Sequence, residues 1–488
     1  MPKSIHNTFS TTVDLTSAER ERIRGSSYYN EALAPVSTAD RTWNAFHIAI
    51  LWVGLAVCIP SYQMASSLIS MGLSWWESVL IVALGNLIIL VPIILNSHVG
   101  TKYGIPFPVF ARISFGVRGA HIPALVRSVI AAGWAGIVMW TGALSINTAI
   151  GLIVPAWSNF AAGIWISFAA FWMINIGFGL FGEKAVKKIE TLGVPVLFVI
   201  CIALFAWAGY ALISGGFSLK AAFITPERGA DFSFWTAFLG GLTANIGYWS
   251  TAALNIPDFS RYAKSQRDQR RGLLWGMPTT MTVLAFLGVF VTGTSIVIYG
   301  EALWDPIMIV ERIGSPFTAF LGAVGIALAS LTTNIAANLI PPANGISNLC
   351  PAKISFRSGM VITGILAILI QPWKLLADPN AYIFTWLNTY AIFTGPLAGI
   401  FIADYYRYRK MEISLAELYL GKEGRYWYTK GINVRAVAAW AISSLLPFLG
   451  LFIDQLSWIT INGWIISFVI SLFVYSALMK GQTSSLSE

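Results

Sequence analysis

The most polar stretch within the apolar part of the chain runs from Ala329 to Asn338 and contains Thr332 and Thr333. Thr333 lies one turn after Ala329 on the same helical face, and two hydroxyls and a carbonyl oxygen there could ligate a hard cation such as Na⁺. The alternative for the threonines alone is a hydrogen bond to the carbonyl one turn earlier, that of Ala329 for Thr333. The Asn338 amide can both donate and accept, so it suits either a ligand or a hydrogen bond to a neighbouring helix.

Two other apolar segments carry residues that interrupt a helix. Gly54 and Cys58-Ile59-Pro60 fall inside the first segment, and Gly240-Gly241 inside the sixth. A proline within a helix frees carbonyl groups that then need another partner. Interrupted helices at corresponding positions of two halves point to a binding site at the middle of a membrane, whereas ordinary kinking is the alternative.

Two tryptophans lie well inside apolar segments rather than at their ends, Trp134 in the third and Trp249 in the sixth. Two such rings could stack on a flat heteroaromatic ligand, although a single buried tryptophan more often packs in a core. Tyr248, next to Trp249, could add a hydroxyl. Most of the other tryptophans, such as Trp75 and Trp157, stand at segment ends and are typical of membrane-interface anchors.

The composition identifies the elements that must position these residues as membrane helices. Of the 488 residues, 56% are hydrophobic and 11% are charged, and the mean hydropathy is +0.69. A soluble protein carries about twice that charged fraction. Long continuous apolar runs exclude a membrane β-barrel. The fold class is therefore an all-α polytopic membrane protein.

Twelve apolar segments are long enough to cross the bilayer as helices. They cover residues 45–71, 76–97, 123–153, 160–181, 191–214, 233–257, 273–299, 315–341, 357–373, 380–404, 433–454 and 457–479. With the N-terminus inside, 27 of the 31 lysines and arginines fall on the cytoplasmic side. The positive-inside rule thus places both termini in the cytoplasm. The net charge of +9 is a topology signal and calls for no nucleic-acid partner.

The segments also suggest a duplication. Spans one to five and spans six to ten have similar lengths and begin on opposite sides of the membrane, which is the inverted-repeat plan of many secondary transporters. We expect a cytoplasmic tail over 1–43, a first repeat over 44–214 and an outer loop over 215–232. A second repeat over 233–404, a basic cytoplasmic loop over 405–432, two further helices over 433–479 and a tail over 480–488 follow.

No pattern in the sequence indicates an enzyme. There is no HExxH, no paired-carboxylate centre and no nucleophile–base motif. The three cysteines, Cys58, Cys201 and Cys350, are far apart, so they suggest neither a zinc site nor a disulfide framework.

Several motifs resemble those of the nucleobase–cation symporter-1 family, which includes hydantoin, allantoin, uracil and cytosine transporters. They are Gly100–Arg112 continuing to Gly119, Asn255–Arg261, Thr332–Asn338, and Gly395–Gly399 with Asp404–Tyr406. The resemblance extends through nearly all twelve spans. It implies a leucine-transporter-like fold of five plus five helices in inverted repeats, with two added C-terminal helices, that works by alternating access.

The resemblance also assigns roles to residues. It implies that the stacking tryptophans are Trp134 and Trp249 and that Asn338 binds the substrate. It implies a sodium site built from backbone carbonyls and two hydroxyls. The sodium ligands would be Gly54, Val57, Ala329, Thr332 and Thr333.

Two positions depart from the hydantoin-type pattern. Those members carry amide side chains where this chain has Cys58 and Val138. An unpaired polar group in a closed site costs roughly 1–3 kcal/mol, so this pocket suits a hydantoin or allantoin less well. A flatter or less polar heterocycle is expected, and Tyr248 adds a hydroxyl that the family pattern does not have.

The function expected is sodium-coupled import of a nucleobase-like heterocycle across the cytoplasmic membrane, by a monomer embedded in the lipid bilayer. The alternatives are a thiamine- or pyridoxine-like vitamin or a nucleoside as substrate, H⁺ as the coupling ion, and a sensor that binds ligand without moving it.

Overall fold

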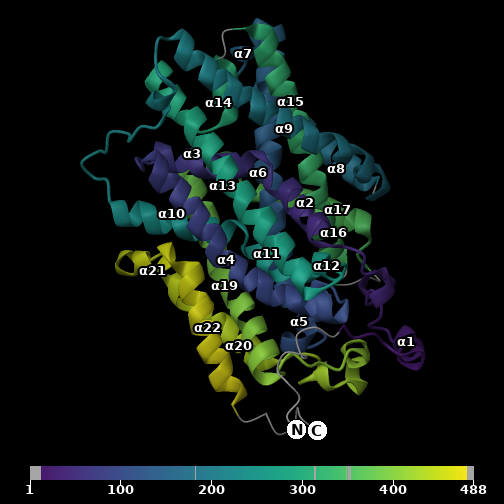
Figure 1. Ribbon diagram of the computed structural model, residues 1–488. Helices are drawn as coiled ribbons and strands as arrows, with labels where there is room; N and C mark the ends of the chain where they lie inside the picture. Colours follow the sequence, from purple (N-terminus) through teal and green to yellow (C-terminus); the bar gives the residue numbers. More distant parts are fainter. Residues whose placement is uncertain (1–11, 182, 313–314, 348, 350–352, 481–488) are drawn as a thin grey trace.

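The computed structural model describes residues 12–181, 183–312, 315–347, 349 and 353–480, and it is almost entirely helical there (Figure 1). The predicted tails lie partly outside this range, at residues 1–11 and 481–488, as does Cys350. The longer helices are α2 (Ala45–Ala56), α3 (Ile59–Ser70), α4 (Trp75–Tyr103), α6 (His121–Ile153), α8 (Gly163–Leu180), α9 (Glu183–Ser214), α10 (Phe234–Tyr248), α13 (Gln266–Tyr299), α15 (Pro316–Asn334), α17 (Phe356–Leu369), α19 (Asn388–Ile402), α20 (Val434–Leu449) and α22 (Gly463–Met479).

Shorter helices connect or extend these. They are α1 (Ser17–Arg24), α5 (Phe107–Phe115), α7 (Pro155–Ser158), α11 (Ser250–Asn255), α12 (Pro257–Ser260), α14 (Pro306–Arg312), α16 (Ile340–Ser347), α18 (Pro372–Leu375) and α21 (Ser457–Ile461). Three π-helical segments are η5 (Ile335–Leu339), η6 (Ala381–Leu387) and η7 (Ala403–Tyr408). Each of the twelve predicted spans falls on one helix or on a consecutive pair or run of helices.

Six of these helices are long and apolar enough to cross a membrane, and two bent helix pairs pass the same test together. One of those pairs is α2 and α3, which meet at 60°. Three helical segments of 10–17 residues are also apolar: Phe198–Ser214, Phe356–Leu369 and Gly463–Met479. The chain is therefore a multi-pass membrane protein.

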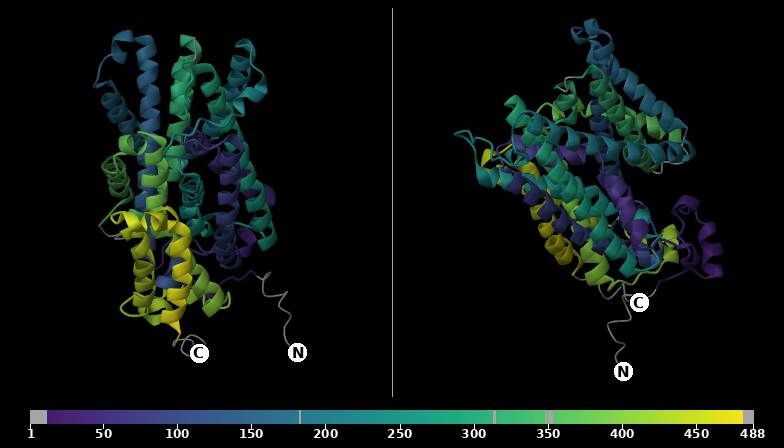
Figure 2. Two further views of the ribbon diagram at one scale, coloured as in Figure 1. Left: turned by 90° about the vertical axis from the view of Figure 1, so that its left-hand side faces the viewer. Right: turned by 45° about the horizontal axis from the view of Figure 1, so that its top comes forward.

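The helices pack in two groups that mix the first and second halves of the chain. In one group α13 packs on α2, α3 and α4, and α10 packs on α4. In the other, α6 packs on α8, α15 and α17. Each group thus contains spans from both predicted repeats, and α9 contacts both groups through α13 and α15. The C-terminal helices α20 and α22 pack on α19 along one side of the molecule (Figure 2).

Several boundaries differ from the prediction, two because the helices continue beyond the apolar runs and one because the helix ends early. α13 begins at Gln266, where Ser265 caps the helix by accepting from the Asp268 N–H, rather than at residue 273. The eighth span continues through η5 and α16 to Ser347 rather than ending at residue 341. The eleventh ends earlier, at Leu449, two residues after Pro447.

The N-terminal segment is docked on the helical body rather than being a simple tail. The Arg41 side chain is buried and donates to the carbonyls of Thr101 and Lys102 at 2.8 and 3.1 Å. It also donates to the Val13 and Val36 carbonyls at 3.1 and 3.0 Å. One guanidinium therefore ties this segment to the end of α4, at the end of the molecule where Figure 1 shows α1 and α5.

Candidate substrate and ion site

One cavity of about 940 Å³ lies where the interrupted first and sixth spans meet α6 and α15. Ten of the eleven predicted site residues line this cavity, and only Val57 does not. The ten are Gly54, Cys58, Trp134, Val138, Tyr248, Trp249, Ala329, Thr332, Thr333 and Asn338.

 The structure thus brings together residues that the sequence separates by up to 284 positions, from Gly54 to Asn338.

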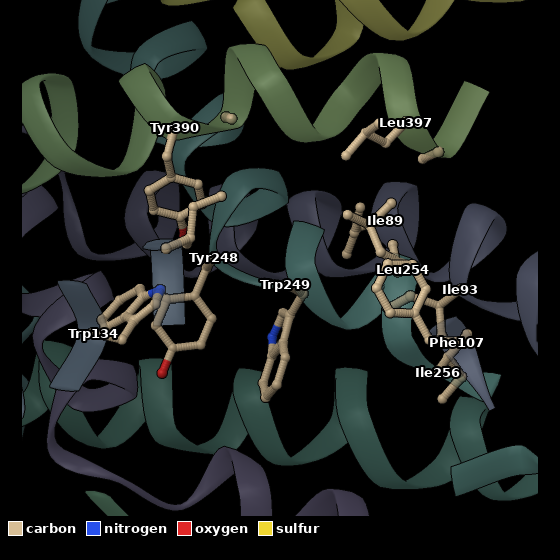
Figure 3. Close-up of a cluster of buried hydrophobic side chains, with 14 of the residues drawn as sticks. Ile89, Ile93, Phe107, Trp134, Tyr248, Trp249, Leu254, Ile256, Tyr390 and Leu397 are labelled. Carbon is tan, nitrogen blue, oxygen red and sulfur yellow. The ribbon is translucent and has the colours of Figure 1, made fainter. Parts of the chain in front are cut away.

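Three aromatic rings stand in a row across the cavity wall (Figure 3). The Tyr248 ring lies 5.1 Å from the Trp134 ring at 77°, and 5.1 Å from the Trp249 ring at 80°. These are edge-to-face arrangements, which the ring quadrupoles favour. The two tryptophans therefore do not face each other across an open gap, because Tyr248 stands between them.

The outer two rings of the row are held from behind by further aromatic side chains. Trp134 contacts Trp386 and Tyr390 edge-to-face, with ring centroids at 5.8 and 6.4 Å. The Tyr390 hydroxyl donates to the Gly247 carbonyl at 2.9 Å, which links the tenth span to the end of α10. Trp249 packs edge-to-face on Trp52 of α2 at 5.2 Å. Packing on both sides limits how far these indoles can turn.

A small polar cluster joins the first and sixth spans beside the row. The Tyr248 hydroxyl lies 2.8 Å from the Ser61 hydroxyl and 3.2 Å from the Cys58 thiol, and the thiol lies 3.2 Å from Ser61. Cys58 precedes α3 and has an extended backbone, so its side chain is free to reach Tyr248. Cys58 and Tyr248 were predicted from the sequence, but Ser61 was not. The available signal was its position directly after Pro60, at the start of α3.

Asn338 is the first of three amides that run from the cavity into the protein. Its side-chain nitrogen donates to the Asn334 oxygen at 3.2 Å, and Asn334 donates to the Asn175 oxygen at 3.0 Å. Asn334 also donates to the Ala135 carbonyl at 3.3 Å, so the amides connect α15 with α6 and α8. Asn338 lies in the π-helical segment η5, a feature that often marks functional sites. Asn334 does not line the cavity, and sequence reasoning gave it no role.

The break between α2 and α3 releases two backbone carbonyls from the helical pattern. The Val57 N–H donates to the Val53 carbonyl at 3.0 Å, and the Cys58 N–H turns to the Ala56 carbonyl at 3.0 Å, so neither reaches Gly54. Beyond the break, Ser61 and Tyr62 both donate to the Cys58 carbonyl rather than to that of Val57. Pro60, which has no N–H, stands at the start of α3. The Gly54 and Val57 oxygens are thereby free of the helix ladder.

The hydroxyls of Thr332 and Thr333 differ in their contacts. Thr332 donates to the Ala329 carbonyl at 3.0 Å, three residues earlier. The back-bond anticipated from Thr333 to Ala329 is thus made by Thr332 instead. Both threonines line the cavity. Val57 does not line it, and it packs in the same apolar cluster as Ala329.

The cavity extends from these residues toward the end of the molecule that carries the docked N-terminal segment. Its wall includes Arg127 of α6, Asn255 of α11 and Phe259 of α12. Asp258, next to Phe259, accepts from the Phe107 N–H of α5 at 2.8 Å, and α5 lies at that end in Figure 1. No aspartate or glutamate is among the described residues that line the cavity.

Comparison with known proteins identifies the family. The family described as permease for cytosine/purines, uracil, thiamine, allantoin matches residues 35–475. The chain belongs to this permease family. It is 39% identical over 474 residues to the purine-uracil permease NCS1 of Arabidopsis thaliana, covering 92% of this chain and 78% of that protein. It is 36% identical over 463 residues to the allantoin permease of Bacillus subtilis (strain 168), covering 92% and 93%.

The fold of this permease matches a solved structure as well. The inward-facing conformation of Mhp1 has a TM-score of 0.77 and 24% identity, and the match covers 94% of this chain and 97% of that one. The leucine-transporter-like fold that the sequence motifs implied is thereby confirmed, and family and fold together identify a transporter.

Proposed function

We propose that this permease is a sodium-coupled symporter that imports a nucleobase-like heterocycle, and that the cavity is the binding site for both. The observation that carries the proposal is that an aromatic row, an amide and Gly54, whose carbonyl the helix break releases, all line one cavity. Relatives named as permeases for purine and uracil and for allantoin support the substrate class.

In this proposal the heterocycle binds against Trp134, Tyr248 and Trp249 and hydrogen-bonds to Asn338. One Asn338 donor is already committed to Asn334, which leaves the amide oxygen and the second N–H for the ligand. Val138 offers an apolar wall, and Cys58 offers a weak donor already close to Tyr248. This set of groups favours a flat ring with one polar edge over a ureide that is polar on every side.

The sodium ion would be held by the carbonyls of Gly54, Val57 and Ala329 and by the hydroxyls of Thr332 and Thr333. All of these are neutral oxygens, and hard cations prefer oxygen ligands. A proton relay through the cavity would need a titratable carboxylate, and the described lining residues include none. Sodium is therefore the coupling ion that we propose, with H⁺ as the alternative that the experiment below separates.

The charge pattern supports insertion in the cytoplasmic membrane with both termini inside. With this orientation, the part of the cavity lined by Arg127 and Asn255 would lie on its cytoplasmic side. We propose that the structure corresponds to a state from which substrate is released, and that the protein works as a monomer. We also propose that the two inverted repeats cover residues 44–214 and 233–404.

The test is uptake into proteoliposomes containing the purified protein. Labelled uracil, allantoin, hydantoin, thiamine and uridine are each offered with an inward sodium gradient, an inward proton gradient or no gradient. We expect accumulation of a nucleobase-like compound above equilibrium with the sodium gradient alone. Accumulation with the proton gradient alone would refute sodium coupling. Saturable binding of these compounds without uptake would refute transport in favour of a sensor.

A further inference from the structure

A partly buried arginine lies in the cavity wall away from the aromatic row. Arg127 is on α6, seven residues before Trp134, and it lines the same cavity. Seven residues are two helical turns, so the two side chains leave the same face of α6 about 10 Å apart along its axis. That separation is larger than a pyrimidine ring, so one ring on Trp134 does not also cover Arg127.

The sixth span places an amide beside this arginine. Asn255 is on α11, six residues after Trp249, and it is buried. With its amide oriented to satisfy its hydrogen bonds, the Asn255 oxygen accepts from Arg127 Nη2 at 2.9 Å, and its nitrogen donates to the Thr251 carbonyl at 2.7 Å. The spans that supply Trp134 and Trp249 thus supply a second pair of facing residues, closer to the cytoplasmic end.

Arg127 makes no direct ion pair with a carboxylate of the described residues. Among the ion pairs of the described residues, none joins a carboxylate to Arg127 within 4.0 Å. Asp258 interacts electrostatically with Arg127 without contacting it, and its carboxylate accepts from the Phe107 N–H at 2.8 Å. Asn255 is neutral, and it occupies one of the five N–H donors of a guanidinium. The remaining donors suit a planar anionic group, which a guanidinium can bind through two parallel hydrogen bonds.

We propose that Arg127 and Asn255 form a second ligand subsite, which binds the carboxylate of an anionic heterocycle on the cytoplasmic side of the aromatic row. The proposal rests on the proposed function only in that ligands pass through this cavity. Its role would be to hold a carboxylated ring near the cytoplasmic opening, either on its way out or as an inhibitor from the cytoplasm.

The test uses two probes that differ in one group, uracil and orotate, which is uracil carrying a carboxylate. Binding of each to the purified full-length protein is measured by isothermal titration calorimetry. The variants are Arg127→Gln, Arg127→Lys and Trp134→Ala. The matched control is Arg118→Gln, which removes the same charge from an exposed arginine that packs on Trp427.

We expect Arg127→Gln to weaken orotate binding by at least about tenfold, as for a lost charge-assisted hydrogen bond, and to leave uracil binding within about twofold. Arg127→Lys should bind orotate more tightly than Arg127→Gln does, since it keeps the positive charge but loses the paired N–H donors of the guanidinium. Trp134→Ala should weaken uracil far more than orotate, and Arg118→Gln should change neither.

Two results would overturn the subsite. One is orotate binding in Arg127→Gln equal to that of the wild type. The other is an equal loss for both probes, which would make Arg127 a residue that only braces α6 against α11. If Arg127→Gln fails to fold, the ratio of orotate to uracil affinity in Arg127→Lys decides, because a ratio equal to that of the wild type contradicts the proposal. Failure of the central ring site would instead appear as unchanged uracil binding in Trp134→Ala.

Discussion

The ring of Tyr248 stands 5.1 Å from that of Trp134, edge-to-face, in the space beside Trp249 where a stacked ligand would lie. A ligand sandwiched between the two indoles would have to displace this side chain or rest against it. Tyr248 is therefore placed to limit the size of the ring that the cavity accepts, while its hydroxyl is held by Ser61 at 2.8 Å.

This relationship predicts opposite effects of two substitutions at one position. Tyr248→Ala vacates the place between the tryptophans, so it should gain binding of a larger ligand such as 5-benzylhydantoin. Tyr248→Phe keeps the ring and removes only the hydroxyl, so it should not gain that ligand. Calorimetric titration of both variants with uracil and 5-benzylhydantoin is the measurement. Equal affinities for the larger ligand in Tyr248→Ala and in the wild type would show that Tyr248 does not limit size.

The two tryptophans should carry a large share of ligand affinity. Stacking on an aromatic side chain contributes about 1–3 kcal/mol per base, so Trp134→Ala and Trp249→Ala should each weaken heterocycle binding by about 10- to 100-fold. Trp458→Ala is the control, because that residue is exposed outside the cavity. Dissociation constants from titration calorimetry decide the matter, and wild-type affinity in both cavity variants would remove the stacking hypothesis.

The amide series predicts that a residue outside the cavity controls affinity inside it. Asn334 is fully buried, and Asn334→Leu would leave Asn338, Asn175 and the Ala135 carbonyl without their partner. Unpaired buried groups cost roughly 1–3 kcal/mol each, so we expect both a lower unfolding temperature and weaker binding.

Asn433→Ala provides the comparison for Asn334→Leu. It removes a buried amide that donates to the Ser114 carbonyl at 2.7 Å, outside the cavity. It should lower the unfolding temperature without changing ligand affinity. Affinity that fell equally in both variants would mean that Asn334 acts only through general stability.

Much of this site was accessible from the sequence because membrane helices report themselves through long apolar runs. The break at Cys58-Ile59-Pro60 was visible because proline cannot complete the helix, and Thr332, Thr333 and Asn338 stood out as polar residues among apolar ones. The position of Tyr248 between the tryptophans was not accessible. It depends on how the end of α10 turns at Trp249, which is a matter of packing between distant spans.

Dependence on packing between distant spans also explains why two other features were not predicted from the sequence. Asn175 and Asn334 lie on separate spans, and only the packing of these spans in the folded structure shows that they are partners. Arg41 in the N-terminal segment looks like an ordinary topology charge, yet its contacts with four backbone carbonyls dock that segment. The pattern of residues along a short stretch of sequence does not show hydrogen bonds between residues that are far apart in the chain.

The connection between α13 and α15 predicts a dependence of stability on pH. Asp305 is buried there and accepts from the Gln63 side chain at 3.0 Å and the Ile307 N–H at 2.9 Å. Burial raises the pKa of the Asp305 carboxyl to about 6, while Glu311 nearby also raises it. Tyr62 of α3 is the other titratable group that faces it.

Because the folded protein binds this proton more tightly than the unfolded chain does, Asp305 favours folding at low pH. Its contribution should be present below about pH 4 and be lost as the pH rises through about 6. Unfolding temperatures of the detergent-solubilised wild type and Asp305→Asn should therefore diverge between pH 5 and pH 7, with the wild type losing more. Parallel curves would mean that Asp305 titrates in the folded state as it does in the unfolded chain.

The ion site is tested most selectively at Thr333. Thr333→Ala should abolish the sodium dependence of ligand binding, whereas Thr333→Ser should retain it because it keeps the hydroxyl. Thr363→Ala is the control, since that buried threonine donates to the Gly359 carbonyl at 2.8 Å outside the cavity. Binding titrations with and without sodium chloride, at ionic strength balanced with choline chloride, distinguish the three variants.

The central claim is that one cavity binds a sodium ion and a heterocycle that strengthen each other's binding. The most direct measurement is the sodium dissociation constant of the wild-type protein with and without saturating uracil, together with the uracil constant with and without saturating sodium. Coupling between two sites is reciprocal, so we predict that both constants fall by the same factor, of about five or more. Two constants unchanged by the other ligand would contradict the account.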